Sequence, residues 1–412
     1  MLRRALISTL LCCLLIGAVQ SSSDPVHAAQ APEGDAYYDG TTLPPLDSRG
    51  IQGQLAKTLQ AINDNRLDVA LQEVDTLLRS NPNFKLAHLV KGDLLMARAG
   101  EIQGIGSAAQ APQDKIEDLR DEARVRLMRV LSKDDQKLPP RFLWQMNAEQ
   151  KYALVVDTSR STLFVYENVN GEPHYVTDFY VTIGKLGTDK YSEGDQRAPL
   201  GVYFVQADLP KDQLADLYGS GAYPLDYPNE WDRRNNRTGS GIWLHGTQSG
   251  TYSRPPRASN GCVVLANDDL DKVSRYLQIG VTPVIISERI DWLDEQTQTE
   301  RAALQQQIEQ WRNDWASLDT QAYLRHYARD FASGGSNYES WAKQKQQVNG
   351  GKTWIKVGLS NVSMFTYPNR PDLVVVNFEQ DYSSSNLSNK MKKRQYWMKQ
   401  DGRWQIVYEG AA

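Results

Sequence analysis

The spacing of hydrophobic positions changes along the chain. From Ile51 to about Leu131 they recur every three or four residues, which predicts amphipathic helices. From Lys151 to Ser287 they alternate or form short runs between turns rich in glycine and proline, which predicts an all-β body. After Ser287 a helical spacing returns, and strand-like runs follow to the C-terminus. The pattern therefore predicts a multidomain chain with a helical part, a central all-β body and a C-terminal α+β domain.

The helical part is expected over residues 51–140. Within it, the stretch DVALQEVDTLLRSNPNFKLAHLVKGDLLMARAG resembles one helix pair of the tetratricopeptide (TPR) type. A repeated array is not visible, so one such pair would have to pack on its neighbours. Two interpretations stay open: a surface that docks a protein partner, or a helical cap on the next domain.

The C-terminal region, residues 300–412, is expected to contain both helices and strands. Leu304, Ile308, Trp311 and Trp315 share one face of a predicted helix. Strand-like runs follow, and the last two flank an Asp401-Gly402 hairpin turn. This general pattern resembles SnoaL-like domains, also called nuclear-transport-factor-two-like (NTF2-like) domains. Such domains bind ligands or mediate assembly as well as catalyse, so a protein partner is possible here too.

The N-terminus has the features of an export signal. Arg3 and Arg4 precede an apolar run, and small residues end at Ala28. This predicts a secretory signal peptide over residues 1–28, followed by a proline- and glycine-rich linker over residues 29–50. The alternative is a retained membrane anchor, although the apolar run is short for a span of about 20 residues. We expect an exported protein of the periplasm or cell envelope.

Composition narrows the possible chemistry. The chain has 412 residues and a net charge of −4, with acidic and basic residues interspersed, which argues against nucleic acid as a partner. Two of its three cysteines lie inside the apolar N-terminal run, so the mature chain would keep only Cys262. A single thiol in an oxidising compartment cannot form an internal disulfide, and catalysis would explain its presence. Scattered histidines offer no metal-ligand spacing, and no cofactor is expected.

The candidate chemistry is concentrated in SGIWLHGTQSGTYSRPPRASNGCVVL. His245 ends a predicted strand, and Cys262 follows seventeen positions later. Because a free thiol has a pKa of about 8.5, a nucleophilic cysteine needs a base nearby, and His245 is the candidate. Backbone N–H groups around the cysteine would bind the oxyanion. Gly261 would let the backbone approach an acyl group closely.

At these residues the chain resembles the L,D-transpeptidase (YkuD) catalytic domain over about residues 151–287. The resemblance covers VVDTSRSTLFVYE, VTIGK, EGDQRAPLGVYFV and SNGCVVL in that order. It implies that the central all-β body is a β-sandwich. It also implies an acyl-cysteine enzyme of cell wall biogenesis and cell shape that acts on peptidoglycan stem peptides at meso-diaminopimelate. The acyl group then passes to an amine of another stem. The family is also typically acylated by carbapenems. By this resemblance Cys262 is the nucleophile and His245 the general base. The residues that it implies for the pocket and the oxyanion site are Gly246, Ser259, Asn260 and Gly261.

The chain departs from the family pattern at three positions. Asn260 stands where a histidine is usual, and Ala198 where threonine often is. Val264 replaces an arginine thought to meet a substrate carboxylate. In lacking this arginine, the chain resembles family members that hydrolyse amide links at diaminopimelate and release wall-attached protein. The acceptor of the acyl group, an amine or water, therefore stays open. Arg254 and Arg257 in the preceding loop are the candidates for the missing carboxylate contact. A non-catalytic wall-binding protein is the other alternative.

Two charged segments are further candidates for substrate contact. Lys185–Asp195 could present charges to a stem peptide, although a solvated loop is the simpler interpretation. The residues before the histidine strand could form a substrate lid, with the same alternative. They are Asp226, Tyr227, Asp232, Arg233 and Arg234.

Overall fold

The computed structural model describes residues 50–99, 106, 112–131 and 138–412. The predicted signal peptide and linker lie outside these residues. The described chain forms two compact units. One contains the N-terminal helices together with Thr247–Ala258, and the other contains the rest of the described chain from residue 138. No helix of the described part is long and apolar enough to cross a membrane.

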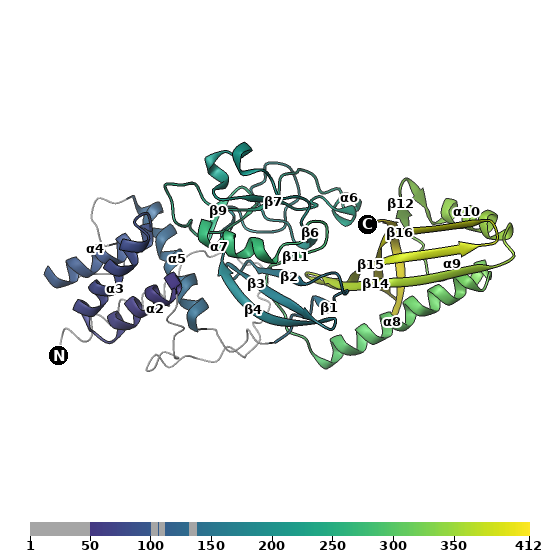
Figure 1. The fold of residues 1–412 in the computed structure, drawn as a ribbon, viewed down its shortest axis with the longest axis horizontal. Coiled ribbons are helices and arrows are strands. Elements are labelled where there is room, and N and C mark those ends of the chain that lie inside the picture. The colour runs from purple at the N-terminus through teal and green to yellow at the C-terminus, as the bar shows by residue number, and fades with distance from the viewer. Residues whose placement is uncertain (1–49, 100–105, 107–111, 132–137) are drawn as a thin grey trace, which may run out of the picture. The chain divides into compact units, whose positions relative to one another are not determined.

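The helical unit is held by one hydrophobic core. Its helices are α2 (Gly50–Asn63), α3 (Leu67–Ser80), α4 (Lys85–Ala99) and α5 (Gln113–Leu131) (Figure 1). Each contributes apolar residues at helical spacing, such as Leu55 and Leu59 of α2 or Val74 and Leu77 of α3. The amphipathic pattern therefore predicted these helices correctly.

The central domain contains two sheets. The larger has the strand order β4-β3-β2-β11-β6, and the smaller has the order β10-β8-β7. The larger sheet consists of β2 (Tyr152–Asp157), β3 (Thr162–Val169), β4 (Glu172–Tyr180), β6 (Gly201–Phe204) and β11 (Pro283–Ser287). The smaller consists of β7 (Ala222–Pro224), β8 (Trp243–His245) and β10 (Val263–Val264). Short strands β5 (Ile183–Gly184) and β9 (Arg257–Ser259) pair with each other.

One hydrophobic core lies between these two sheets. Leu154 and Val156 of β2 pack there with Leu244 of β8 and Val263 of β10. This confirms the predicted sandwich. Two short helices accompany it, α6 (Glu230–Arg234) and α7 (Asn267–Val273), so the domain is not purely β.

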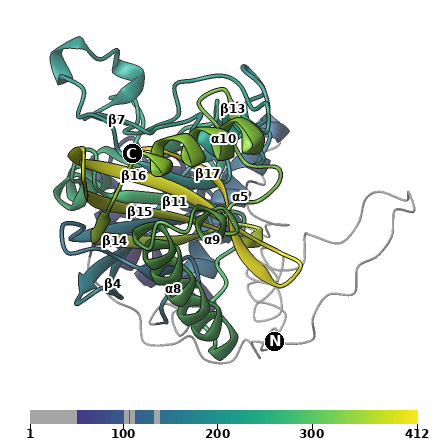
Figure 2. The ribbon, with the colours of Figure 1, turned by 90° about the vertical axis from the view of Figure 1, so that its right-hand side faces the viewer.

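The C-terminal domain is a five-stranded antiparallel sheet with helices on one face (Figure 2). The helices are α8 (Glu295–Ala316), α9 (Thr320–Leu324) and α10 (Tyr338–Gly350). The long strands are β14 (Ile355–Tyr367), β15 (Arg370–Ser384), β16 (Leu387–Gln400) and β17 (Arg403–Ala411), and a small hairpin is formed by β12 (Ala332–Ser333) and β13 (Ser336–Asn337). Asp401 and Gly402 both have positive φ, as the predicted two-residue turn requires. The predicted α+β domain is confirmed.

One edge strand of the C-terminal sheet is formed by residues that precede the central domain in the sequence. Strand β1 (Leu143–Gln145) pairs antiparallel with β14, so that Leu143 lies opposite Phe365. The central domain is therefore inserted between two parts of the C-terminal sheet.

The two five-stranded sheets share a second hydrophobic core. Ala153 and Val155 of β2 point away from the sandwich core and pack in a cluster with Phe365, Val375 and other residues of the C-terminal sheet. Along β15, Val374 and Val376 face the helices, whereas Leu373 and Val375 face the central domain. Both sheets are thus buried on both faces. This explains why ALVV in β2 and LVVV in β15 are continuous apolar runs rather than alternating ones.

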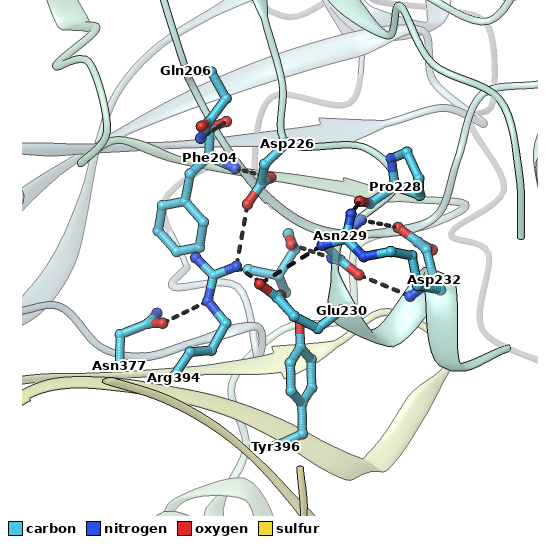
Figure 3. A network of polar contacts seen from close by, with 12 residues as sticks. Phe204, Gln206, Asp226, Pro228, Asn229, Glu230, Asp232, Asn377, Arg394 and Tyr396 are labelled. Carbon is cyan, nitrogen blue, oxygen red and sulfur yellow. Dashed lines mark hydrogen bonds and ion pairs between the residues drawn. The ribbon is translucent and has the colours of Figure 1, made fainter. Parts of the chain in front are cut away.

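A buried ion-pair network lies at the same junction (Figure 3). The Arg394 guanidinium on β16 lies 3.2 Å from a carboxylate oxygen of Asp226 and 3.0 Å from one of Glu230. Its Nε donates to Asn377 at 2.9 Å, and its guanidinium lies over the Phe204 ring. The side chain of Arg394 is only 10% exposed. Removal of this cation would leave two carboxylates facing each other with little solvent.

We therefore expect Arg394→Met to lower the free energy of unfolding by about 3–5 kcal/mol, because the buried carboxylates lose their partner. Denaturant unfolding at pH 7 measures this change. The control is Lys392→Met on the same strand, whose side chain is 59% exposed. That change should stay within about 0.5 kcal/mol. Equal effects of the two substitutions would contradict the assignment.

Candidate active site

The smaller sheet brings His245 and Cys262 to the same face. Strands β8 and β10 are parallel neighbours, with Leu244 opposite Val263 and His245 opposite Val264. Leu244 and Val263 both point into the sandwich core. Since side chains alternate along a strand, His245 and Cys262 point to the opposite, outer face. These two residues, seventeen positions apart in sequence, thus lie on one sheet face, and their catalytic roles stay a prediction.

A backbone carbonyl orients the His245 ring. Its Nδ1 lies 2.7 Å from the carbonyl oxygen of Gly246, and the residue is 4% exposed. Because a carbonyl can only accept, Nδ1 must carry the proton in this contact. The neutral ring then has its lone pair on Nε2. This is the tautomer that a general base requires, and it needs no carboxylate partner.

The thiol of Cys262 is partly exposed. Its Sγ lies 3.3 Å from the carbonyl oxygen of Gly241, to which the thiol can donate. The turn before it is held by the buried Ser259 side chain. Ser259 Oγ donates to the Cys262 carbonyl at 2.7 Å and accepts from the Gly261 N–H at 3.1 Å. Ser259 therefore fixes the backbone that carries the nucleophile.

The glycines of the motif are explained by close backbone packing. Gly261 has φ +121°, and a Cβ there would lie 2.6 Å from the Arg197 carbonyl oxygen. A Cβ on Gly246 would lie 2.2 Å from Asn267 Oδ1. These contacts require glycine at both positions, and the role of the two residues in a substrate pocket stays a prediction. The Gly261 N–H, however, is engaged by Ser259 and is not free to bind an oxyanion in this conformation. Asn260 is exposed.

Two aromatic residues at this face, Tyr218 and Trp243, were not among the predicted site residues. The ring of Tyr218, in the 3-10 turn η3 (Asp216–Tyr218), lies 5.2 Å from the His245 ring and 4.8 Å from the Trp243 ring between centroids. The Tyr218 carbonyl also accepts from the Gly246 N–H at 2.9 Å. The position of Trp243 two residues before His245 was the available signal, because both then share a strand face. Nothing in the sequence indicated Tyr218.

Val264 lies directly opposite His245 in the β8–β10 register and is 2% exposed. Its backbone N–H and carbonyl pair with Thr182. The position at which the resemblance implies an arginine is therefore filled by a buried apolar side chain next to the candidate base. No charge is available to a substrate from this position.

The charged segment from Lys185 to Asp195 is not simply a solvated loop. Lys190 is 3% exposed, and its ammonium donates to Asp195 Oδ1 at 2.8 Å. Although partial burial opposes it, the Lys190 hydrogen bond and three backbone N–H groups lower the pKa of Asp195 to about 2. These two charges stabilise the loop internally. The Lys185 N–H donates to the Ser259 carbonyl at 2.7 Å, so the segment supports the turn before Cys262.

The segment before the histidine strand is bound to the C-terminal domain. Asp226 pairs with Arg394, and Arg234 pairs with Asp330 at 3.0 Å. Asn229 caps α6 through its contacts with Asp232 (Figure 3). Its Nδ2 also donates to the Tyr367 hydroxyl at 2.7 Å. These contacts assign Asp226 and Arg234 to the junction described above rather than to a mobile substrate lid.

Arg254 and Arg257 belong to the compact unit of the helices, whereas His245 and Cys262 belong to the other. Arg257 is exposed and begins β9. Their contact with a substrate carboxylate stays a prediction. In the described residues, no group of three or more His, Cys, Asp or Glu side chains is arranged to hold a metal ion.

Comparison with known proteins gives two family matches. Residues 151–286 match the L,D-transpeptidase catalytic domain (YkuD), and residues 303–410 match the Cds6 C-terminal NTF2-like domain. The chain is 31% identical to Bd1075 of Bdellovibrio bacteriovorus, over 67% of this chain and 98% of that one, with a TM-score of 0.59. It is 24% identical to the helical cell shape determining protein Pgp2 of Campylobacter jejuni, over 67% and 96%, with a TM-score of 0.56. No curated protein matches the chain.

A pH effect on stability is expected from Asp232, which is almost fully buried. Burial raises the pKa of its carboxyl from 3.8 to about 6, even though the Asn229 N–H and the Tyr203 hydroxyl favour the charged form. The folded state therefore holds this proton more tightly than the unfolded state. The stabilising contribution is complete below about pH 4 and is lost as the pH rises through 6.

Asp232→Asn removes this titration while the amide oxygen can still accept from Asn229. The stability of the wild type relative to this variant should thus fall between pH 4 and pH 7, by at most roughly 3 kcal/mol. Denaturant unfolding of both proteins across this range measures the difference. Asp401→Asn in an exposed turn is the control for the loss of one negative charge. A difference that rises with pH would refute the assignment.

Proposed function

The chain belongs to the L,D-transpeptidase (YkuD) family, and from this premise we propose that it acts on peptidoglycan stem peptides through an acyl-cysteine at Cys262. The bond cleaved is the amide that follows meso-diaminopimelate, the third residue of the stem. The acyl group then passes to an amine of another stem. The observation that carries the proposal is the β8–β10 register, which puts His245 and Cys262 on one sheet face.

The residues present can perform each step of the first half-reaction. His245 Nε2 takes the thiol proton, and Sγ attacks the carbonyl carbon of diaminopimelate. The tetrahedral intermediate expels the amine of the fourth residue, which receives the proton from His245. An acyl-thioester on Cys262 and a free amino acid result. In the second half, His245 deprotonates the acceptor amine, the new amide forms, and the thiol is regenerated.

A second candidate acceptor, water, is favoured by Val264. A charge-assisted hydrogen bond is worth about 1.5–3 kcal/mol. An apolar residue beside His245 cannot offer such a bond to a stem carboxylate. If no other group supplies it, water replaces the second stem as acceptor. The products would then be shortened stems, or proteins released from the wall.

We also propose that the protein is exported and acts in the cell envelope, since its expected substrate lies there and its N-terminus has the pattern of a signal peptide. Pgp2 is described as a determinant of helical cell shape. A role of this chain in cell shape is consistent with that description and with remodelling of stem peptides.

Two substrates test the proposed function. The first is purified disaccharide-tetrapeptide, and the second is a stem bonded to a peptide at diaminopimelate. Cross-linked dimers from the first would support transfer to an amine. Disaccharide-tripeptide without dimers, or release of the peptide from the second, would support water as acceptor. Cys262→Ser and His245→Ala should each lower the rate by at least a thousandfold, and their combination should lose little more, because the two act as one unit.

Mass spectrometry of the separated muropeptides identifies these products. Thermal unfolding of each variant controls for loss of fold. Wild-type protein that leaves both substrates intact, or a Cys262→Ser variant with near-normal turnover, would overturn the proposal in favour of a non-catalytic wall-binding protein.

A carbapenem provides an independent test of the nucleophile. Attack by Cys262 Sγ opens the β-lactam ring and leaves a thioester, so the protein mass should rise by the full mass of the drug. Intact-mass spectrometry of the wild type and Cys262→Ala detects the adduct, and peptide mapping assigns it. An adduct on both proteins, or on neither, would count against the assignment.

A further inference from the structure

Two positively charged residues contact the turn that carries the candidate nucleophile. The Lys185 N–H donates to the Ser259 carbonyl at 2.7 Å. The Arg197 carbonyl packs on Gly261, where a Cβ would lie 2.6 Å from the Arg197 oxygen. Ser259 holds this turn, and Gly261 directly precedes Cys262. The backbones of both cations are therefore in contact with the turn, and all of these residues belong to the same compact unit.

The segment that joins the two cations also packs against a second neighbour of the thiol. A Cβ on Gly239 would lie 3.1 Å from Glu193 Cα, so the two backbones are in contact there. Two residues further along, the Gly241 carbonyl oxygen lies 3.3 Å from Cys262 Sγ. Residues 185–197 therefore pack on the stretch that contacts the thiol as well as on the turn that carries it.

Lys185 and Arg197 are the cations of this segment that no acid neutralises. Two ion pairs compensate its other basic and acidic groups: Lys190–Asp195 at 2.8 Å and Arg237–Asp189 at 2.7 Å. Lys185 and Arg197 are exposed, and within the part of the chain that the structure describes neither takes part in an ion pair. Glu193 is exposed too and pairs with neither of them. Two cations beside the thiol are thus available to an anionic group of a substrate.

Arg197 is held in place while part of its guanidinium stays available. Its backbone N–H donates to Asp195 Oδ1 at 3.1 Å, and its side-chain NH1 donates to the Thr188 carbonyl at 2.9 Å. A guanidinium has several N–H donors in a planar fork, so others remain for a bidentate contact with a carboxylate. Because the side chain is already ordered, it loses less conformational freedom on binding. Lys185 adds a point charge without such a fixed geometry.

We propose that Arg197 and Lys185 are specificity-determining residues that bind a carboxylate of the substrate beside the bond that Cys262 attacks. This inference rests on the proposed function and names the group of the stem that is recognised. The side chain of diaminopimelate ends in a free carboxylate, to which the position of Val264 offers no charge. Arg197 binds this carboxylate through two N–H groups, and Lys185 adds its charge. The same side chain also ends in an ammonium group, so the acid Glu193 in this segment is compatible with its binding.

The test uses two disaccharide-tetrapeptides that differ only in the diaminopimelate side chain, whose carboxylate is free in one and amidated in the other. Release of the fourth residue is measured, because this step is the same for an amine and for water as acceptor. The wild type should have a kcat/KM about tenfold higher for the free carboxylate, mainly through KM. Lys185→Ala/Arg197→Ala should reduce this preference to within about twofold. Arg197→Lys should keep part of it, since the charge remains but the planar fork does not.

Two matched controls remove exposed cations at other positions of the central domain. Lys151→Ala, just before β2, and Arg275→Ala, in the turn after α7, should leave the preference unchanged. Thermal unfolding shows whether each variant is folded. A wild type without a preference for the free carboxylate, or a preference that survives in Lys185→Ala/Arg197→Ala, would overturn the inference.

Failure of the proposed function gives a different result. A wild type that releases no amino acid from either substrate would refute that function, and binding to Cys262→Ala then decides the inference without turnover. Equilibrium dialysis with the two disaccharide-tetrapeptides measures this binding. Tighter binding of the free carboxylate that is lost when Arg197→Ala is added would support the inference, and equal binding of the two would overturn it.

Discussion

The contact between the two five-stranded sheets is the constraint on which the rest of the structure depends. Each sheet uses one face for its own domain core and the other for the shared core around Val155, Phe365 and Val375. Neither sheet is therefore complete without the other, because an uncovered face would expose a continuous apolar surface. Arg394 adds a specific polar contact to this apolar one, because it pairs with both Asp226 and Glu230. The segment before the histidine strand is fixed as a consequence.

Most of the local structure could be predicted from the sequence because its signals are local. The Asp401-Gly402 turn, the helix that follows Ser287 and the strand that ends at His245 all depend on neighbouring residues. The pairing of His245 with Cys262 was also predictable, but through the motif and the family resemblance rather than through spacing. The three-part architecture followed from the change in hydrophobic period alone.

What could not be predicted depends on long-range pairing. Nothing in Leu143–Gln145 indicates that its partner strand lies more than 200 positions later, at Met364 and Phe365. Tyr218 reaches His245 because an irregular turn folds back, and such turns carry no periodic pattern. The charged residues Asp226 and Arg234 lie in a polar segment whose composition is typical of a solvated loop. They are instead paired with Arg394 and Asp330, whose positions only the folded C-terminal domain provides.

The position of β1 has a consequence for how the chain is assembled. The strand is made before the central domain, but its hydrogen-bonding partner is made long after it. During synthesis, the emerging chain must carry an unpaired edge strand and an uncovered β2 face until roughly the last 60 residues have appeared. Such exposed edges favour pairing with the wrong chain. The inserted domain thus places a requirement on folding order. A chain cut short after Ser287 would be a substrate for chaperones and proteases rather than a smaller folded protein.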